Sequence, residues 1–274
     1  MRKLEGKVAV ITGAGRGIGR AVALKLAQDG ACIVVNDLDA APAEEVVKEV
    51  EALGSKAIAF AGSVTAPDFA SKLVAATLES FGTIDMVINN AGYTWDGSAQ
   101  KMTDEQWQAM LDVHTTAPFR ILRAAFEPMR LAAKQEADEG REVFRKVVNV
   151  ASLTGVIGSA FQCNYSAAKA GVIGLTKALA KEWGRYKINV NCVAFGLVET
   201  RLTAVREGDK ADTINIEGRE LNVGIAKATH DRLPQIIPLG RGATVEEAAG
   251  AIYLMCLPEA NYVTGQVLCC DGGR

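Results

Sequence analysis

The sequence predicts an α/β protein built on one doubly wound parallel sheet of about seven strands, with helices on both faces. Short apolar runs rich in β-branched residues alternate along the chain with longer stretches of helical periodicity. A glycine-rich turn follows the first apolar run and opens the first helical stretch. The 274 residues, of which 49% are hydrophobic, can bury one substantial core, and no linker or repeat divides them. We therefore expect a single domain over residues 1–274.

The alternation assigns the elements in order. Buried strands are predicted at residues 7–12, 32–36, 56–60, 85–89, 146–150, 188–193 and 266–270. Helices are predicted at residues 17–29, 42–53, 67–81, 105–133, 165–184 and 245–256. Strands and helices that alternate in this way form βαβ units, in which the strands are parallel and the helices cover the sheet.

Two segments interrupt the alternation. Residues 134–145 are highly charged and predict a solvated helix end followed by a loop. Residues 197–237 form a long insertion before the last helix, and a long insertion in a compact domain is usually a lid or binding loop. Within it, the sequence TINIEGRELNVGI alternates apolar and polar residues on either side of Gly218, which predicts a small β-hairpin.

Composition excludes several classes of function. The formal net charge of −2, with acids and bases interleaved, argues against a nucleic-acid surface. The N-terminal apolar run is too short for a signal peptide or a membrane span, so we expect a cytoplasmic protein without membrane contact. Six cysteines without a CxxC pair, and only two histidines, signal neither a metal site nor a disulfide framework.

The glycine-rich turn predicts a dinucleotide site. In TGAGRGIG, Gly13, Gly15, Gly17 and Gly19 connect the first strand to the first helix. Glycines allow the backbone to turn tightly and approach a pyrophosphate, and the N–H groups at the helix N-terminus face its negative charge. The fold is therefore expected to be of the Rossmann type.

Asp37 ends the second predicted strand, where a carboxylate can accept hydrogen bonds from the ribose hydroxyls of the adenosine. The same carboxylate would repel a 2′-phosphate, so it favours NAD(H) over NADP(H). Asp39 is a competing candidate that lies farther past the strand. Arg16 instead favours NADP(H), because a guanidinium in the glycine turn can hold a 2′-phosphate. The residue after Asp37 is Leu38, so this position supplies no second basic side chain for a 2′-phosphate. We therefore expect NAD(H).

Three motifs together resemble the short-chain dehydrogenase/reductase family over nearly the whole chain. They are TGxxxGxG at residues 12–19, INNAG at residues 88–92, and Tyr165-x-x-x-Lys169. Each follows a predicted strand, where a doubly wound fold binds its ligand. The sequence PLGR at residues 238–241 and the C-terminal YVTGQVLCCDGG are similar to those of 3-oxoacyl-(acyl-carrier-protein) reductases and related 3-hydroxyacyl-CoA dehydrogenases.

The resemblance implies a catalytic group of three residues. Tyr165 would be the general acid/base, and Lys169 would lower the pKa of the phenol and bind the nicotinamide ribose. An ordinary tyrosine, with a pKa of about 10, is a poor base at neutral pH, so a nearby cation is required. Ser152 would donate a hydrogen bond to the carbonyl oxygen of the substrate. Tyr and Lys four residues apart also occur commonly on ordinary helix surfaces.

His114 departs from the family pattern, which implies an asparagine that holds a water linking the lysine to solvent. A histidine can bond such a water through either ring nitrogen, or it can simply fill space within a helix. Both interpretations stay open. Ser63 likewise replaces the usual acid or amide after the third strand, which leaves the adenine amino group a weaker partner. Phe195 replaces the proline that usually precedes Gly196.

The cofactor-binding residues implied by the resemblance are Gly13, Arg16, Gly17, Ile18, Gly19, Asp37, Ser63, Val64, Asn90, Ala91, Gly92, Tyr165, Lys169, Gly196, Val198 and Thr200. The implied reaction is hydride transfer between NAD(P)(H) and a secondary alcohol or ketone. The favoured substrate is a 3-oxoacyl or 3-hydroxyacyl thioester of CoA or acyl carrier protein. Arg201, Arg206, Lys210 and Arg219 in the insertion could attract it, and a solvated loop of mixed charge explains them equally well. The alternatives are a polyol, steroid or other secondary alcohol, or a non-catalytic dinucleotide sensor. A homotetramer is implied by the resemblance alone.

Overall fold

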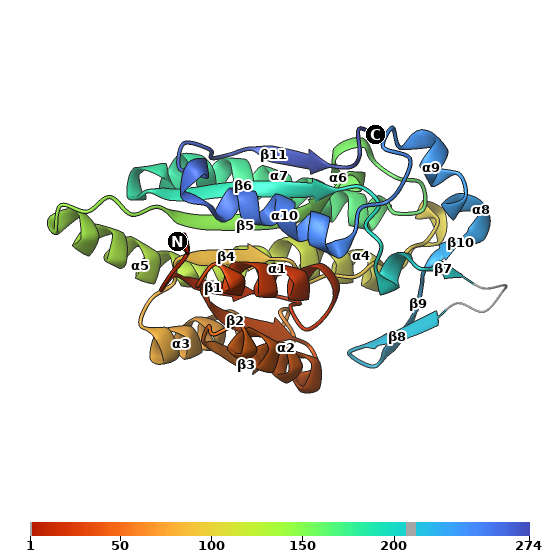
Figure 1. The fold of residues 1–274 in the computed structure, drawn as a ribbon. Helices are drawn as coiled ribbons and strands as arrows, with labels where there is room; N and C mark the ends of the chain where they lie inside the picture. Colours follow the sequence, from red (N-terminus) through yellow and green to blue (C-terminus); the bar gives the residue numbers. More distant parts are fainter. Residues whose placement is uncertain (1, 207–211) are drawn as a thin grey trace.

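The computed structural model describes residues 2–206 and 212–274 (Figure 1). Seven parallel strands form one sheet in the order β11-β6-β5-β4-β1-β2-β3. The strands are β1 (Val8–Ile11), β2 (Cys32–Asp37), β3 (Ala57–Ala61), β4 (Met86–Asn89), β5 (Arg145–Ser152), β6 (Ile188–Phe195) and β11 (Val267–Cys270). The order in which strands are added to the sheet therefore reverses between β1 and β4. A ligand is expected in the crevice beyond the carboxyl ends of these two strands. The predicted fold class is confirmed.

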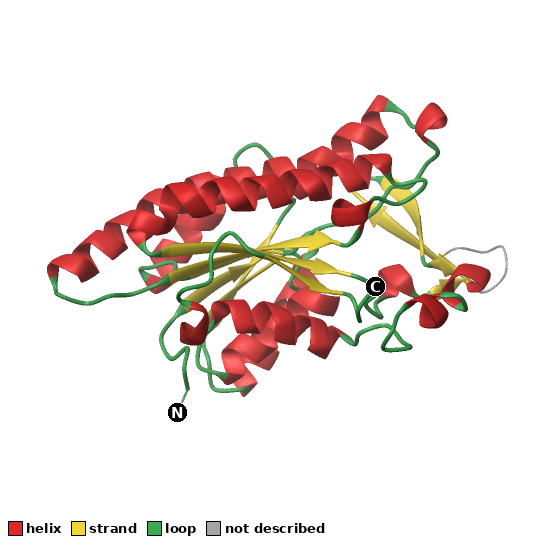
Figure 2. Ribbon diagram, turned by 90° about the horizontal axis from the view of Figure 1, so that it is seen from above, coloured by secondary structure: helices red, strands yellow, loops and turns green. Residues whose placement is uncertain are grey.

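Helices cover both faces of the sheet (Figure 2). One face carries α1 (Gly17–Gln28), α2 (Ala40–Ala52) and α10 (Val245–Cys256), which pack on one another. The other face carries α3 (Phe69–Phe81), α4 (Asp104–Leu111), α5 (Ala117–Asp138) and α7 (Cys163–Trp183). Alternate residues of β1 enter opposite cores, with Ile11 in one and Val10 in the other. Burial on both faces is the reason that the strands read as continuous apolar runs.

The helix predicted at 105–133 is interrupted, and it ends later. A π-helical turn, η2 (Asp112–Thr116), separates α4 from α5, which continues to Asp138. Pro118 lies just after this turn and has no N–H to donate to the preceding turn, so regular α-helical bonding cannot run through it. Such π-turns often occur at functional sites, and this one contains His114.

The prediction of a fully solvated segment at 134–145 is wrong at two positions. Arg145, with 1% of its side chain exposed, makes two hydrogen bonds with Glu136, at 2.7 and 3.0 Å. Arg145 begins β5, whose central position in the sheet buries it, and Glu136 in the last turns of α5 supplies the counter-charge. A bidentate carboxylate partner is the arrangement that makes a buried guanidinium tolerable.

The insertion at 197–237 folds into small elements beyond the carboxyl edge of the sheet (Figure 1). They are η4 (Arg201–Thr203), β7 (Val205–Arg206), β8 (Asp212–Ile216), β9 (Arg219–Val223), β10 (Ile225–Ala226), α8 (Lys227–His230) and α9 (Leu233–Ile236). Strands β8 and β9 pair in antiparallel fashion, which confirms the hairpin predicted around Gly218. Lys210 lies outside the described residues.

The remaining short helices are η1 (Ala99–Lys101), α6 (Thr154–Ile157), η3 (Gly184–Tyr186) and η5 (Pro258–Ala260). Within residues 2–206 and 212–274, no helix is both long and apolar enough to cross a bilayer. The same residues contain no cluster of three or more His, Cys, Asp or Glu side chains arranged to hold a metal ion.

Candidate active site

The glycine turn between β1 and α1 forms a cradle that side chains would fill. Gly13 and Gly17 have φ values of +62° and +54°, a region that favours glycine. At Gly19, a Cβ atom would lie 2.2 Å from the carbonyl oxygen of Gly13. The backbone can therefore approach a ligand closely here, and the first N–H groups of α1 lack intrahelical partners.

Asn90 and Thr12 hold this cradle in place. The side-chain amide of Asn90 donates to the carbonyl oxygens of Thr12 and Gly13, each at 3.0 Å. In return, the Thr12 hydroxyl accepts hydrogen bonds from the backbone N–H groups of Asn90 and Ala91. Ile18 packs against the core beneath the turn. The structure thus brings the predicted residues of INNAG against the glycine turn, and it adds Thr12, which the sequence analysis did not select.

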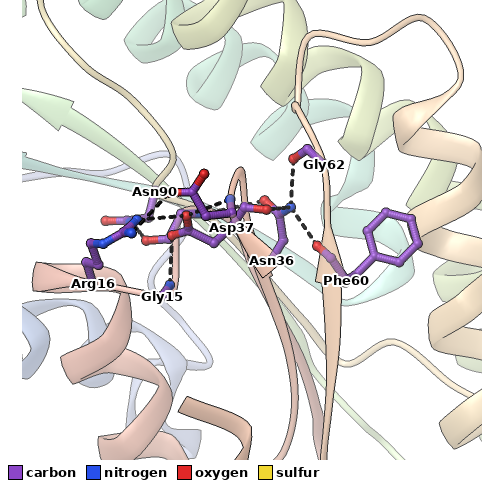
Figure 3. Close-up of polar contacts among 9 residues, drawn as sticks. Gly15, Arg16, Asn36, Asp37, Phe60, Gly62 and Asn90 are labelled. Carbon is purple, nitrogen blue, oxygen red and sulfur yellow. Dashed lines mark hydrogen bonds and ion pairs between the residues drawn. The ribbon is translucent and has the colours of Figure 1, made fainter. Parts of the chain in front are cut away.

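Asp37 lies at the end of β2 and faces the glycine turn (Figure 3). Its carboxylate accepts hydrogen bonds from the backbone N–H of Gly15, at 3.0 Å, and from the Arg16 guanidinium, at 3.3 Å. Arg16 also forms an ion pair with Asp39, at 3.0 Å. Two carboxylates therefore neutralise the guanidinium of Arg16.

Asn36 is a second residue that the sequence analysis did not select. Its buried side-chain amide donates to the carbonyl oxygens of Phe60, at 2.9 Å, and Gly62, at 3.1 Å, at the end of β3 (Figure 3). Its amide oxygen accepts from the N–H of Gly13 at 3.4 Å. One side chain thereby ties the ends of β2 and β3 to the glycine turn. A polar residue in an otherwise apolar strand, beside Asp37, was the available signal.

A cleft of about 610 Å³ opens beside Arg16 and Asp37, and its opposite wall is the β8–β9 hairpin. That volume lies within the range of cofactor sites. The cleft joins a glycine cradle for a pyrophosphate to a carboxylate for a ribose, and these residues fit a dinucleotide. The bound group would lie along the carboxyl edge of the sheet.

Ser152, Tyr165 and Lys169 meet at the ends of β5 and α7. The Ser152 hydroxyl accepts a hydrogen bond from the N–H of Thr154 at 3.2 Å and lies close enough to Tyr165 to lower the pKa of the phenol. The Lys169 ammonium lies 5.6 Å from the centre of the Tyr165 ring and donates to the carbonyl oxygen of Val150 at 2.6 Å. Gly155 allows α6 to pack closely against α7, because a Cβ at this position would lie 2.7 Å from the Lys169 backbone.

Burial dominates the proton affinities of this group. It raises the pKa of Tyr165 to about 12, and the nearby Ser152 side chain opposes this shift. Burial also lowers the pKa of Lys169 to about 8. Burial thus raises the phenol pKa, and the expected lowering by the lysine is wrong for this arrangement. The phenol stays protonated at neutral pH, as a proton donor must.

His114 packs edge-on against the Tyr165 ring, with ring centres 5.0 Å apart. Its Nε2 atom lies 2.8 Å from the carbonyl oxygen of Tyr93, so the proton belongs on Nε2, and Nδ1 is buried with no hydrogen-bond partner among the described residues. Burial, followed by the charge of Lys169, holds the pKa of His114 well below its usual value. A neutral ring with a free acceptor nitrogen therefore lies beside Tyr165 and Lys169. Gly92 is required there, because a Cβ would lie 2.3 Å from the ring.

The other predicted cofactor residues lie in the segments that follow β3 and β6. Val198 pairs with Ala243, and the Thr200 methyl group lies 4.0 Å from the point a Cβ of Gly17 would occupy. Gly196 passes close to the backbone of Asp271. After β3, the Ser63 hydroxyl is 2.8 Å from that of Thr65, while Val64 is buried against α3.

Asn164 positions the start of α7. Its buried amide donates to the carbonyl oxygens of Trp95 and Gln106, and its oxygen accepts from the N–H of Tyr165. Trp95 in turn packs, with Tyr93, against the apolar face of the β8–β9 hairpin. Since Tyr93 also bonds His114, which packs on Tyr165, the hairpin, the histidine and Tyr165 form one continuous set of contacts.

Comparisons with known proteins agree with this geometry. The family model described as short chain dehydrogenase matches residues 7–211. A 3-oxoacyl-(acyl-carrier-protein) reductase from Synechocystis is 38% identical, and the alignment covers 100% of this chain and 98% of the relative. Another, from Thermotoga maritima, is 36% identical over 99% of this chain and 98% of the relative. A crystal structure from Sinorhizobium meliloti, described as a candidate short-chain alcohol dehydrogenase, superposes with a TM-score of 0.84 at 28% identity, over 99% of this chain and 97% of that one.

Proposed function

Because this chain belongs to the short-chain dehydrogenase family and is thus an NAD(P)-dependent oxidoreductase, we propose that it interconverts 3-oxoacyl and 3-hydroxyacyl thioesters. The observation that carries the proposal is that Tyr165 and Lys169 lie together at the start of α7, near Ser152 at the end of β5, in a fold whose glycine turn and Asp37 fit a dinucleotide. The thioester is supported by relatives that are named as 3-oxoacyl reductases and match the chain from end to end.

The chain's residues supply proton transfer and charge stabilisation. The carbonyl carbon of the substrate would receive its hydride from a nicotinamide bound in this site. Ser152 and Tyr165 donate hydrogen bonds to the carbonyl oxygen, and Tyr165 gives its proton to that oxygen as negative charge develops. Lys169, charged below its pKa of about 8, stabilises the phenolate that remains. Nδ1 of His114 accepts a hydrogen bond from a water that returns a proton through Lys169.

The experiment that tests the substrate class compares ketones. Purified protein is mixed with NADH and either acetoacetyl-CoA, acetoacetyl-acyl carrier protein, or a simple ketone such as cyclohexanone. We expect the reduced-nicotinamide absorbance to fall with kcat/KM at least tenfold higher for a thioester than for the simple ketone. A preference for unactivated ketones would move the assignment to another secondary alcohol. Cofactor binding without turnover of any ketone would favour a sensor.

We propose NAD(H) as the preferred cofactor, supported by the carboxylates of Asp37 and Asp39 around Arg16. Replacing Asp37 with serine removes the charge nearest the ribose and leaves Arg16 with Asp39 as its one remaining carboxylate partner among the described residues. We expect the ratio of kcat/KM for NADH to that for NADPH to fall by about 100-fold, because repulsion of the 2′-phosphate is replaced by attraction. The matched control is Asp104→Ser, which removes an exposed acid from the first turn of α4. A wild-type protein that prefers NADPH would contradict the proposal directly.

A homotetramer is supported by an apolar groove between α5 and α7. This groove, of about 640 Å³, is lined by Phe119, Phe126, Leu179 and Trp183, among others. Phe119 is 42% exposed in the single chain. An exposed aromatic side chain beside an apolar groove is typical of a subunit interface. Sedimentation equilibrium tests this proposal, and a monomer at micromolar concentration would contradict it.

A further inference from the structure

The tip of the β8–β9 hairpin lies across the cleft from the cofactor residues. Thr213, Asn215, Ile216 and Glu217 line the same cleft as Asp37. The Glu217 carboxylate reaches the loop after β3, where it accepts a hydrogen bond from the hydroxyl of Thr65 at 3.3 Å. In Figure 1 the hairpin accordingly projects from the carboxyl edge of the sheet toward the side that carries β2 and β3.

Glu217 occupies an unusual backbone conformation for its residue type. It and Gly218 are the two central residues of the hairpin turn, with φ values of +53° and +82°. Such turns favour Asn, Asp or Gly at the first position, and a longer side chain with positive φ is uncommon. The turn is held by Asn215, whose side-chain oxygen accepts from the N–H of Gly218 at 2.9 Å. The position thus presents a carboxylate at the outermost point of the hairpin.

Arg219 orients this carboxylate. Its guanidinium lies 3.5 Å from Glu217, donates to Glu105 at 2.8 Å, and stacks over the ring of Trp95. Arg219 is thus committed to acids of the protein itself. A carboxylate can accept about four hydrogen bonds. With Thr65 and Arg219 on its two oxygens, Glu217 keeps the capacity to accept from a ligand.

The order of the strands indicates which part of a dinucleotide faces Glu217. The glycine turn that holds the pyrophosphate follows β1, and Asp37, which binds the ribose, follows β2. The next strand outward is β3, so the base extends toward Thr65 and Glu217. Leu38 and Ile216 line this part of the cleft from opposite walls and offer apolar surfaces to a planar ring.

We propose that Glu217 accepts a hydrogen bond from the exocyclic amino group of the adenine base, which makes the β8–β9 hairpin a wall of the cofactor site. Adenine carries a donor at this position, and an oriented carboxylate is the strongest acceptor that a protein offers. Ser63, in the loop after β3, forms a hydrogen bond with Thr65, and Thr65 donates to Glu217. Glu217 therefore adds a charged acceptor to the polar groups of this loop. The inference rests on the proposed dinucleotide function.

The test measures binding rather than turnover. Reduced nicotinamide adenine dinucleotide and its hypoxanthine analogue are titrated against the protein, with binding followed by nicotinamide fluorescence. Hypoxanthine replaces the amino donor at C6 with a carbonyl acceptor and turns N1 from an acceptor into an N–H donor, and it leaves the sugars, the pyrophosphate and the nicotinamide unchanged. We expect the wild-type protein to bind the adenine form about tenfold more tightly, as expected for one partly exposed hydrogen bond to a charge.

Glu217→Gln preserves the shape of the side chain, but its amide can both accept and donate. We expect the preference for adenine to fall to within about twofold in this variant. The matched control is Glu220→Gln, an exposed acid on β9 of the same hairpin, which should keep the wild-type preference. An unchanged preference in Glu217→Gln, with NADH binding intact, would overturn the inference alone. Failure of the wild-type protein to bind either dinucleotide would overturn the proposed function as well.

Discussion

Replacing Tyr165 with phenylalanine is expected to lower kcat for ketone reduction by about 10³-fold, within the range for loss of a positioned proton donor. Burial raises the pKa of Tyr165 to about 12, so the phenol is protonated throughout the working pH range. Phenylalanine keeps the ring that packs against His114 but has no proton to give to the developing oxyanion. The measurement is single-turnover oxidation of NADH, which isolates the chemical step.

Two controls make this result interpretable. NADH binding to Tyr165→Phe should remain within a few-fold of the wild-type value, because the glycine turn and Asp37 are untouched. Tyr186→Phe, in the short helix η3 after α7, removes a phenol remote from the glycine turn and should leave kcat unchanged. If Tyr165→Phe kept more than a tenth of the wild-type rate, Tyr165 could not be the proton donor.

Lys169 is expected to set the alkaline limit of the reductive reaction. Burial lowers the pKa of its ammonium to about 8. The charged form exists below that pH and is lost as the pH rises through it. Because the charge stabilises the phenolate left by Tyr165, kcat should fall tenfold per pH unit above about pH 8. Lys169→Met should lower kcat by about 10²-fold at pH 7 and remove the pH dependence.

Lys169→Arg separates charge from titration, because a guanidinium stays protonated at every pH tested. This variant should lose the decline above pH 8, although its rate at pH 7 will be lower than that of the wild type. His114→Asn should keep the decline, since His114 is already neutral and serves as an acceptor. A decline at pH 8 that persisted in both Lys169 variants would assign it to another group.

The predicted motifs whose residues the structure brings together are those in which spacing along the chain already determines proximity. Four residues of α-helix place Tyr165 and Lys169 on one face, and a strand followed by glycines places the turn at the carboxyl edge of the sheet. Asn90 could be associated with the glycine turn because parallel strands end at the same edge. These relations are local, or follow from the topology.

The features that were missed depend on contacts between distant segments. Glu217 forms a hydrogen bond with Thr65, which lies 152 residues away in the sequence. Neither segment contains a motif that predicts this contact. In the sequence, Arg145 belongs to a charged run that predicts solvent exposure. It is buried because it begins β5, which lies between β6 and β4 in the sheet. The pKa of Tyr165 depends on the desolvation that the whole fold produces, so it cannot be predicted from a sequence motif.

The measurement that tests the central claim most directly follows deuterium from C4 of labelled NADH into the product of acetoacetyl-CoA reduction. Mass spectrometry of the product should show one deuterium at C3 of 3-hydroxybutyryl-CoA for the wild-type protein, and none above background for Tyr165→Phe in the same time. Oxidation of the cofactor without label at C3 would contradict hydride transfer to a 3-oxoacyl thioester.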